Sequence, residues 1–167
     1  MKLLSIDPSS NLTGLAFFQD GELIRAVTLI ASGTTWTERF SSLTSQTRSL
    51  LETSQVSGHL EIAIERIPTV AHPGIGLAGG AVLAGAGLAG VIANVTKESF
   101  ISPSSWKALA RKAGDSDRSP KGVSALDYVL PGSGVRDEDA ADAVLIGLAY
   151  LARKKPPVAV RVKETYF

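Results

Sequence analysis

The chain has 167 residues, of which 44% are hydrophobic and 20% charged, with 17 Lys and Arg against 16 Asp and Glu. A chain of this length and composition can bury one substantial hydrophobic core, so we expect a single domain over residues 1–167. The absence of cysteine excludes a disulfide framework and a thiolate zinc site. The residues after Met1 lack the basic-then-apolar run of a secretory signal, so we expect a cytoplasmic protein.

The first thirty residues predict three antiparallel strands. An apolar run at Lys2–Ile6 is followed by strand-like runs at Leu12–Gln19 and Gly21–Ile30. Asp20 and Gly21, between the last two runs, are typical of a tight hairpin turn. This part of the chain is therefore expected to form an antiparallel meander.

A helix and a fourth strand follow the meander. Apolar residues recur at helical spacing in Thr37–Leu51, and Leu60–Ile67 is a second apolar run that stops at Pro68. Because a helix connects the two, we expect the fourth strand to lie parallel beside the first. Asp7 and Glu65, at the ends of these two strands, would then be neighbours.

The segment Gly74–Val95 contains no charged residue and is long enough to span a membrane. Gly and Ala dominate it, however, so we expect a packed helix and no contact with a membrane. Two G-x-G-x-x-G patterns occur in it, but neither directly follows a strand, as a dinucleotide-binding turn requires. Gly76, Gly80 and Ala84 share one helix face, which predicts close packing of that face against the sheet or a second subunit.

The remaining elements are a short fifth strand and three helices. The strand is expected at Glu98–Ser102, and the helices at Pro103–Arg111, Gly122–Val129 and Asp137–Lys154. The core-facing residues of the last helix are Val144, Leu145, Leu148 and Leu151. The predicted fold is thus α/β, with a five-stranded mixed sheet and helices on both faces.

Four carboxylates stand where this fold would bring them together: Asp7, Glu65, Asp139 and Asp142. Carboxylates are costly at the ends of apolar strands unless a cation compensates them, and magnesium would do so. An alternative for the last two is that acids favour the start of a helix, with Asp137 as its cap. Asp142 lies a turn inside that helix among alanines, which favours a ligand role and hence phosphodiester chemistry.

Basic residues gather after the second acidic strand. The candidates for DNA contact are Arg66, His72, Lys107, Arg111, Lys112, Arg118 and Lys121. The alternative for the lysines and arginines is ordinary solvation, and a lone loop histidine is more often inert than stacked on a base. A further cluster at residues 153–163 is interpreted as a helix end, where basic side chains favour the dipole.

Three motifs carry a resemblance that spans nearly the whole chain. They are Ile6-Asp7-Pro8-Ser-Ser-Asn11-Leu-Thr13-Gly14, Ala63-Ile64-Glu65 and Asp139-Ala-Ala-Asp142-Ala143. In this order they resemble the RuvC family of Holliday-junction resolvases, within the ribonuclease H and retroviral-integrase superfamily. The resemblance implies a ribonuclease H-like fold and an endodeoxyribonuclease that makes paired symmetric nicks in a four-way junction, leaving 5′-phosphate and 3′-hydroxyl ends.

The resemblance also implies ligands and partners. The four carboxylates would hold two Mg²⁺ ions, for which Mn²⁺ substitutes, and Lys107 and Lys121 would lie near the scissile phosphate. Family members act as homodimers on branched DNA. One departure concerns the segment after Glu65, where many members carry an aromatic that enters the junction: residues 67–73 have none, which leaves selectivity for a four-way junction open.

Three other interpretations remain. A cutter of flaps or replication forks would have the same chemistry on a wider range of branched substrates. A non-catalytic DNA-binding domain of the same fold would keep the basic residues without metal dependence. The opening Asp7 to Gly14 also resembles the first phosphate loop of actin-like ATPases, but those proteins need two such domains, and no second copy occurs here.

Overall fold

The computed structural model describes residues 1–66, 73–111 and 122–154. Its strands are β1 (Lys2–Asp7), β2 (Leu12–Gln19), β3 (Glu22–Ile30), β4 (Gly58–Glu65), β5 (Val91–Asn94) and β6 (Phe100–Ile101). Its helices are α1 (Trp36–Thr53), α2 (Pro73–Leu88), α3 (Pro103–Arg111), α4 (Gly122–Val129) and α5 (Glu138–Lys154), with a 3-10 turn, η1, at Lys97–Ser99.

The strands form one mixed sheet in the order β3-β2-β1-β4-β5, with β6 pairing β4 beyond the end of β5. The predicted meander is confirmed, because β1 to β3 are antiparallel and Asp20 and Gly21 turn the hairpin with positive φ of 53° and 91°. The parallel pairing of β4 with β1 is confirmed as well. These results establish the predicted α/β fold with helices on both faces.

The predicted number of strands is wrong, because the sheet has six strands and not five. The additional strand, β5, lies in the uncharged segment that was assigned to a helix; Gly90, at a φ of 75°, separates it from α2. The bounds of two predicted strands also differ from the structure. The fourth runs over Gly58–Glu65, two residues before the predicted Leu60–Ile67, and of the fifth only Phe100–Ile101 pairs, because Lys97–Ser99 coils into a 3-10 turn.

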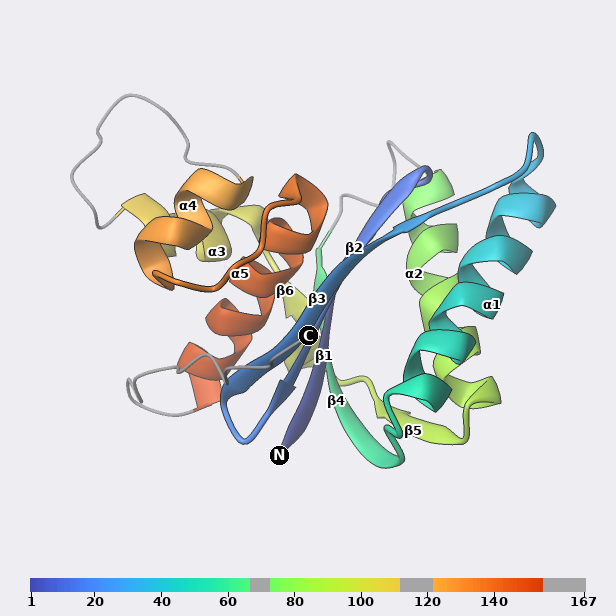
Figure 1. Cartoon of the computed structure of the whole chain (residues 1–167), viewed down its shortest axis with the longest axis horizontal. Coiled ribbons are helices and arrows are strands. Elements are labelled where there is room, and N and C mark those ends of the chain that lie inside the picture. The colour runs from blue at the N-terminus through green and yellow to red at the C-terminus, as the bar shows by residue number, and fades with distance from the viewer. Residues whose placement is uncertain (67–72, 112–121, 155–167) are drawn as a thin grey trace.

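Two helical layers cover the two faces of the sheet, α1 and α2 on one side and α3, α4 and α5 on the other (Figure 1). Alternate residues of each strand point to opposite layers. In β1, Leu4 and Ile6 pack with α1 and α2, whereas Leu3 packs in the cluster around α5. The sheet therefore separates two hydrophobic cores, and the side of the sheet that a strand residue faces follows from its position in the strand.

Helix α5 lies across the sheet and begins where the sequence predicts. The backbone N–H of Ala140 donates to Oδ1 of Asp137 at 3.1 Å, so Asp137 caps the helix as predicted. Of its predicted core residues, Val144, Leu145 and Leu148 are buried and Leu151 is half-buried. Its last residue, Lys154, is also the predicted one.

The predicted face of the glycine-rich helix does not pack within the chain, which leaves packing against a second subunit as the untested alternative. A Cβ at Gly76 would meet nothing within 4 Å, and one at Gly80 would meet only Phe40, at 3.9 Å. Close packing instead uses Gly85, where a Cβ would lie 2.5 Å from the carbonyl oxygen of Thr44 on α1. The helix still covers the sheet, as expected, through a different set of small residues. In the described part of the chain, no helix is long and apolar enough to cross a membrane.

Candidate active site

The predicted meeting of Asp7 and Glu65 is confirmed by the register of β1 and β4. Ile6 pairs with Ile64, so the two acids follow side by side at the same edge of the sheet. Asp7 has the same parity as Leu3 in β1, and Glu65 the same parity as Ala63 in β4. Leu3 and Ala63 both pack in the hydrophobic cluster around α5, so the two acids lie on the side of the sheet that α5 covers.

Close packing brings the start of α5 to this edge. Gly14 on β2 is the pairing partner of Asp7, and a Cβ there would lie 1.9 Å from the carbonyl oxygen of Asp139. Only glycine at this position lets the backbone of α5 pass so near to Asp7. The buried hydroxyl of Ser5 adds a tie, because it donates to the carbonyl oxygen of Ala143 at 2.7 Å. The sequence interpretation missed Ser5, whose only signal is a polar residue within an apolar strand.

Asp142 is held from the other side by the start of α4. The backbone N–H of Gly122 donates to Oδ1 of Asp142 at 2.8 Å, and that of Val123 donates to Oε2 of Glu138 at 3.3 Å. Gly122 has a positive φ of 53°, a conformation that favours glycine. The structure thus orients Asp142 with a backbone donor that the sequence did not predict.

Asp7 is at the centre of the four acids electrostatically. Burial, followed by repulsion from Glu65, Asp142 and Asp139, raises its pKa to about 8. The pKa of Asp142 is also raised, chiefly by burial, although the Gly122 N–H opposes this. Burial raises the pKa of Asp139 too, assisted by Asp137. Mutual repulsion among half-buried carboxylates is the condition that a bound cation relieves.

The chemistry of these donors fits a divalent cation. Carboxylate oxygens are the ligands that Mg²⁺ and Mn²⁺ prefer, and no cysteine or histidine is among them. Within residues 1–66, 73–111 and 122–154, however, no three acidic or histidine side chains are disposed as a ready-made metal site. The four acids therefore act on one another electrostatically without forming a ready-made set of ligands around one point.

Lys107 acts electrostatically on one of the four acids, Asp142. Its ammonium opposes the rise in the pKa of Asp142 and sits over the ring of Trp106, 4.9 Å from the ring centroid. The indole Nε1–H of Trp106 in turn donates to Oε1 of Glu65 at 3.0 Å. The sequence interpretation did not single out Trp106, because this contact joins α3 to β4 across the fold.

This chain is similar to known proteins in its structure and not detectably in its sequence. No protein-family model matches the chain, and no curated protein matches it. Among solved structures, the chain is similar to Thermus thermophilus RuvC in complex with a Holliday junction substrate, with a TM-score of 0.64 at 20% identity over 92% of this chain and 96% of that one. The chain has a RuvC-like fold. A second structure of Thermus thermophilus RuvC gives a TM-score of 0.62, with the same identity and coverage.

On this RuvC-like fold, the other predicted DNA-contacting residues are placed only in part. Arg66 is exposed directly after Glu65, and its backbone N–H donates to the carbonyl oxygen of Ile101 at 2.7 Å. Arg111 ends α3, and its side chain is not described. The predictions outside the described residues are His72, Lys112, Arg118 and Lys121.

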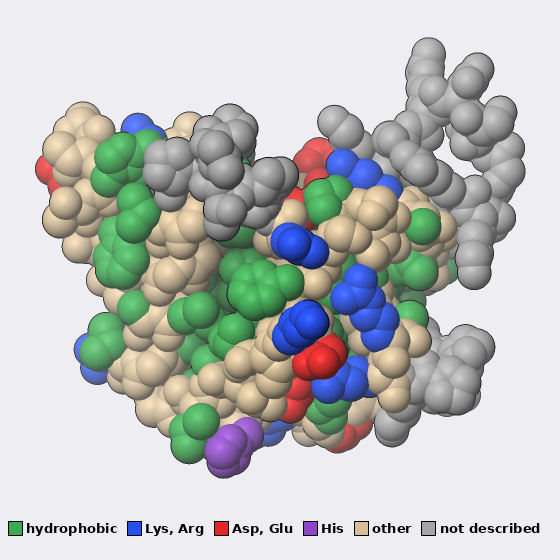
Figure 2. Space-filling view, turned by 180° about the vertical axis from the view of Figure 1, so that it is seen from behind, with side chains coloured by type: hydrophobic (Ala, Val, Ile, Leu, Met, Phe, Trp, Pro, Cys, Tyr) green, Lys and Arg blue, Asp and Glu red, His purple; other side chains and the backbone are tan. Residues whose placement is uncertain are grey.

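Lys and Arg side chains gather along the middle of the face opposite to that of Figure 1 (Figure 2). At one edge of the sheet lie β4, β5 and β6, and α5 contacts β4 and β6 there. Their exposed basic residues, together with η1, include Arg66, Lys97, Arg153 and Lys154. These basic side chains lie together with acidic ones, because Glu61 and Glu98 interact with Lys154, and Glu98 also with Lys97.

Proposed function

We propose that this protein is a structure-selective endodeoxyribonuclease that resolves four-way DNA junctions by paired symmetric nicks. The observation that carries the proposal is the set of four carboxylates around Asp7, at the edge where β1 and β4 end on a RuvC-like fold. The similar Thermus thermophilus RuvC was solved with a Holliday junction substrate, which supports branched DNA as the substrate class. A nuclease for flaps or forks is the second candidate, because residues 67–73 contain no aromatic.

Asp7, Glu65, Asp139 and Asp142 are the proposed ligands of two Mg²⁺ ions, for which Mn²⁺ substitutes. When bound, such ions activate a water molecule and stabilise the departing 3′ oxygen, which gives 5′-phosphate and 3′-hydroxyl products. The chain itself holds the ligands in place: Gly122 donates to Asp142, and Gly14 lets Asp139 approach Asp7. Lys107, beside these acids, is proposed to bind the scissile phosphate.

Homodimer formation is part of the proposal. The outward face of α2 exposes Gly76, Leu77, Gly80, Gly87 and Leu88, of which Leu77 and Leu88 are 43% and 61% exposed. A face without any charged or polar side chain favours burial against a second copy of the chain. We expect light scattering to give the mass of a dimer, and Leu88→Glu to give a folded monomer; a dimer that persists in this variant would place the interface elsewhere.

The test of the activity compares three labelled DNA substrates: an immobile four-way junction, the matching linear duplex and a forked duplex. With Mg²⁺, we expect paired nicks in the junction alone, and none with chelator. Calcium should support binding without cutting. Asp7→Asn should abolish cutting while it spares binding, and cleavage that persists in this variant would refute the site. Equal cutting of the fork would identify a broader branched-DNA nuclease.

A further inference from the structure

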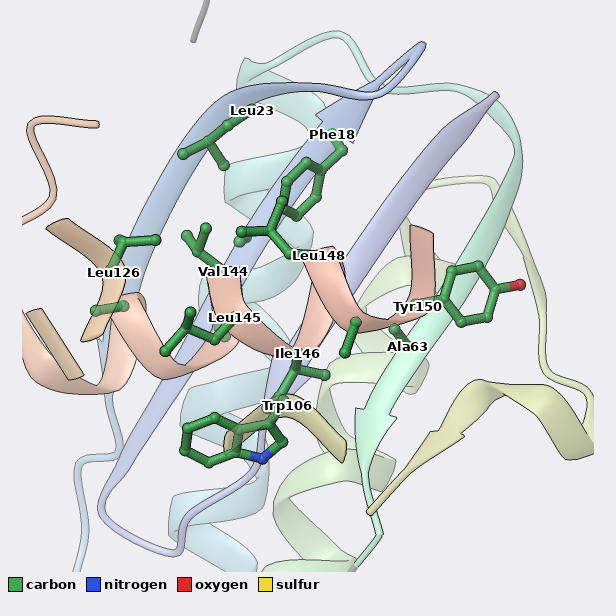
Figure 3. Close-up of a cluster of buried hydrophobic side chains, with 14 of the residues drawn as sticks. Phe18, Leu23, Ala63, Trp106, Leu126, Val144, Leu145, Ile146, Leu148 and Tyr150 are labelled. Carbon is green, nitrogen blue, oxygen red and sulfur yellow. The ribbon is translucent and has the colours of Figure 1, made fainter. Parts of the chain in front are cut away.

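One buried aromatic ring contacts two parts of the proposed site. Trp106 on α3 is only 2% exposed and packs in the hydrophobic cluster against α5, near Ile146 (Figure 3). Its indole N–H donates to Oε1 of Glu65, which lies on a different layer of the fold. A buried indole N–H needs an acceptor, and here the acceptor is a carboxylate that is also a proposed metal ligand.

The face of the same ring supports a charge. The ammonium of Lys107 lies 4.9 Å from the ring centroid of Trp106, within the range of a cation–π interaction. Trp106 therefore connects Glu65, through its N–H, with Lys107, through its ring.

We propose that Trp106 is a positioning residue of the metal site: its N–H fixes the orientation of the Glu65 carboxylate, and its ring holds the ammonium of Lys107. This inference rests on the proposed function. Hydrogen-bond donors behind metal ligands fix ligand geometry before the metal binds, and their loss typically weakens metal affinity by about 10-fold to 100-fold. The alternative is that Trp106 only fills the core.

A matched pair of substitutions separates the two roles. Tyr150 on α5 is also fully buried in the same cluster, and its hydroxyl donates to Oε2 of Glu61 at 2.6 Å. Trp106→Phe and Tyr150→Phe thus each remove one aromatic donor from a glutamate of β4, but only Glu65 is a proposed ligand. If Trp106 merely filled the core, both variants would lose stability and neither would lose metal affinity selectively.

The first measurement is the affinity for Mn²⁺ by isothermal titration calorimetry at constant pH, on variants shown to be folded by circular dichroism. We expect Trp106→Phe to bind Mn²⁺ about 10-fold to 100-fold more weakly and Tyr150→Phe to bind it as the wild type does. Junction cleavage by Trp106→Phe should recover as Mg²⁺ is raised. Unchanged affinity in Trp106→Phe would overturn the inference; a wild-type protein that binds no Mn²⁺ would overturn the proposed function itself.

The second measurement is made on the protein with Trp106 intact, and a variant at the exposed Trp36 is used only to assign the signals. The chain has two tryptophans, so a ¹⁵N-labelled sample gives two indole N–H resonances, which Trp36→Phe assigns. Trp36 is 49% exposed and serves as an internal reference. We expect Mg²⁺ to shift the Trp106 resonance and leave that of Trp36 in place. A Trp106 resonance that stays fixed while calorimetry records metal binding would overturn the inference.

Discussion

Ionised Asp7 lowers the free energy of unfolding of the protein when no metal is bound. Its pKa is raised from 3.8 in the unfolded reference to about 8 in the fold, so its proton is bound more tightly in the folded state. The stability that this proton provides is complete below pH 4 and is lost as the pH rises toward 8. With chelator, we expect the free energy of unfolding to fall by roughly 1–3 kcal/mol between pH 5 and pH 8, measured by urea unfolding.

Asp7→Asn is the matched control for this slope, because the amide has no proton to lose in that range. The variant should be the more stable protein at pH 8 without metal. The raised pKa values of Asp139 and Asp142 leave a smaller slope of the same sign in the variant. Identical pH profiles for the two proteins would mean that Asp7 is ionised freely in the fold.

Gly14 is predicted to be intolerant of any side chain. A Cβ would lie 1.9 Å from the carbonyl oxygen of Asp139, so Gly14→Ala must push the start of α5 away from β2. We expect a loss of about 1–3 kcal/mol in stability, measured by urea unfolding, and a weaker affinity for Mn²⁺, because Asp139 moves away from Asp7. Gly87→Ala is the control, since a Cβ there meets nothing within 4 Å. Equal behaviour of the two variants would contradict this account.

At the scale of elements, two glycines of α2 should respond in opposite directions. Gly85→Ala places a Cβ 2.5 Å from the carbonyl oxygen of Thr44 and separates α1 from α2, so we expect a loss of about 1–3 kcal/mol. Gly76→Ala meets nothing of its own chain within 4 Å and, measured in the monomeric Leu88→Glu background because Gly76 lies on the proposed dimer face, should gain up to about 1 kcal/mol from helix propensity. Thermal unfolding of the two variants measures both effects.

Most elements could be predicted from the sequence, because periodicity and turn residues act locally. The hairpin at Asp20 and Gly21 and the capped start of α5 are examples. Strand β5 could not be predicted, because four residues directly after a glycine-rich helix carry too short a pattern. The packing glycines of α2 were missed for another reason: which helix face is covered depends on α1, and periodicity does not reveal the neighbour.

At the scale of the whole molecule, the position of the acids could be predicted but not their surroundings. The parallel crossover from β1 to β4 follows from chain order, so the pairing of Asp7 with Glu65 was foreseeable. The contact of Trp106 with Glu65 was not, because it spans 41 residues between α3 and β4 and depends on the final packing. The same holds for the Gly122 N–H on Asp142, which depends on how α4 meets α5.

The salt dependence of DNA binding should show whether Lys107 contacts a DNA phosphate. In calcium, which should prevent cutting, Lys107→Met is expected to weaken junction binding and to reduce the slope of log affinity against log salt by about one. Arg48→Met is the control, because Arg48 lies on α1, on the opposite side of the sheet, and pairs with Glu52 at 2.7 Å. An equal change of slope in both variants would show that Lys107 contributes only to net charge.

The four carboxylates come from three segments that are far apart in the chain, and two of the four are on α5. During synthesis on the ribosome, β1 and β4 are therefore made and can pair long before Asp139 and Asp142 emerge. A nascent chain has half of the proposed ligand set until α5 leaves the exit tunnel and packs over Gly14 and Ser5. The proposed nuclease activity would thereby be withheld from incomplete chains, because the proposed metal site could form only once α5 has docked.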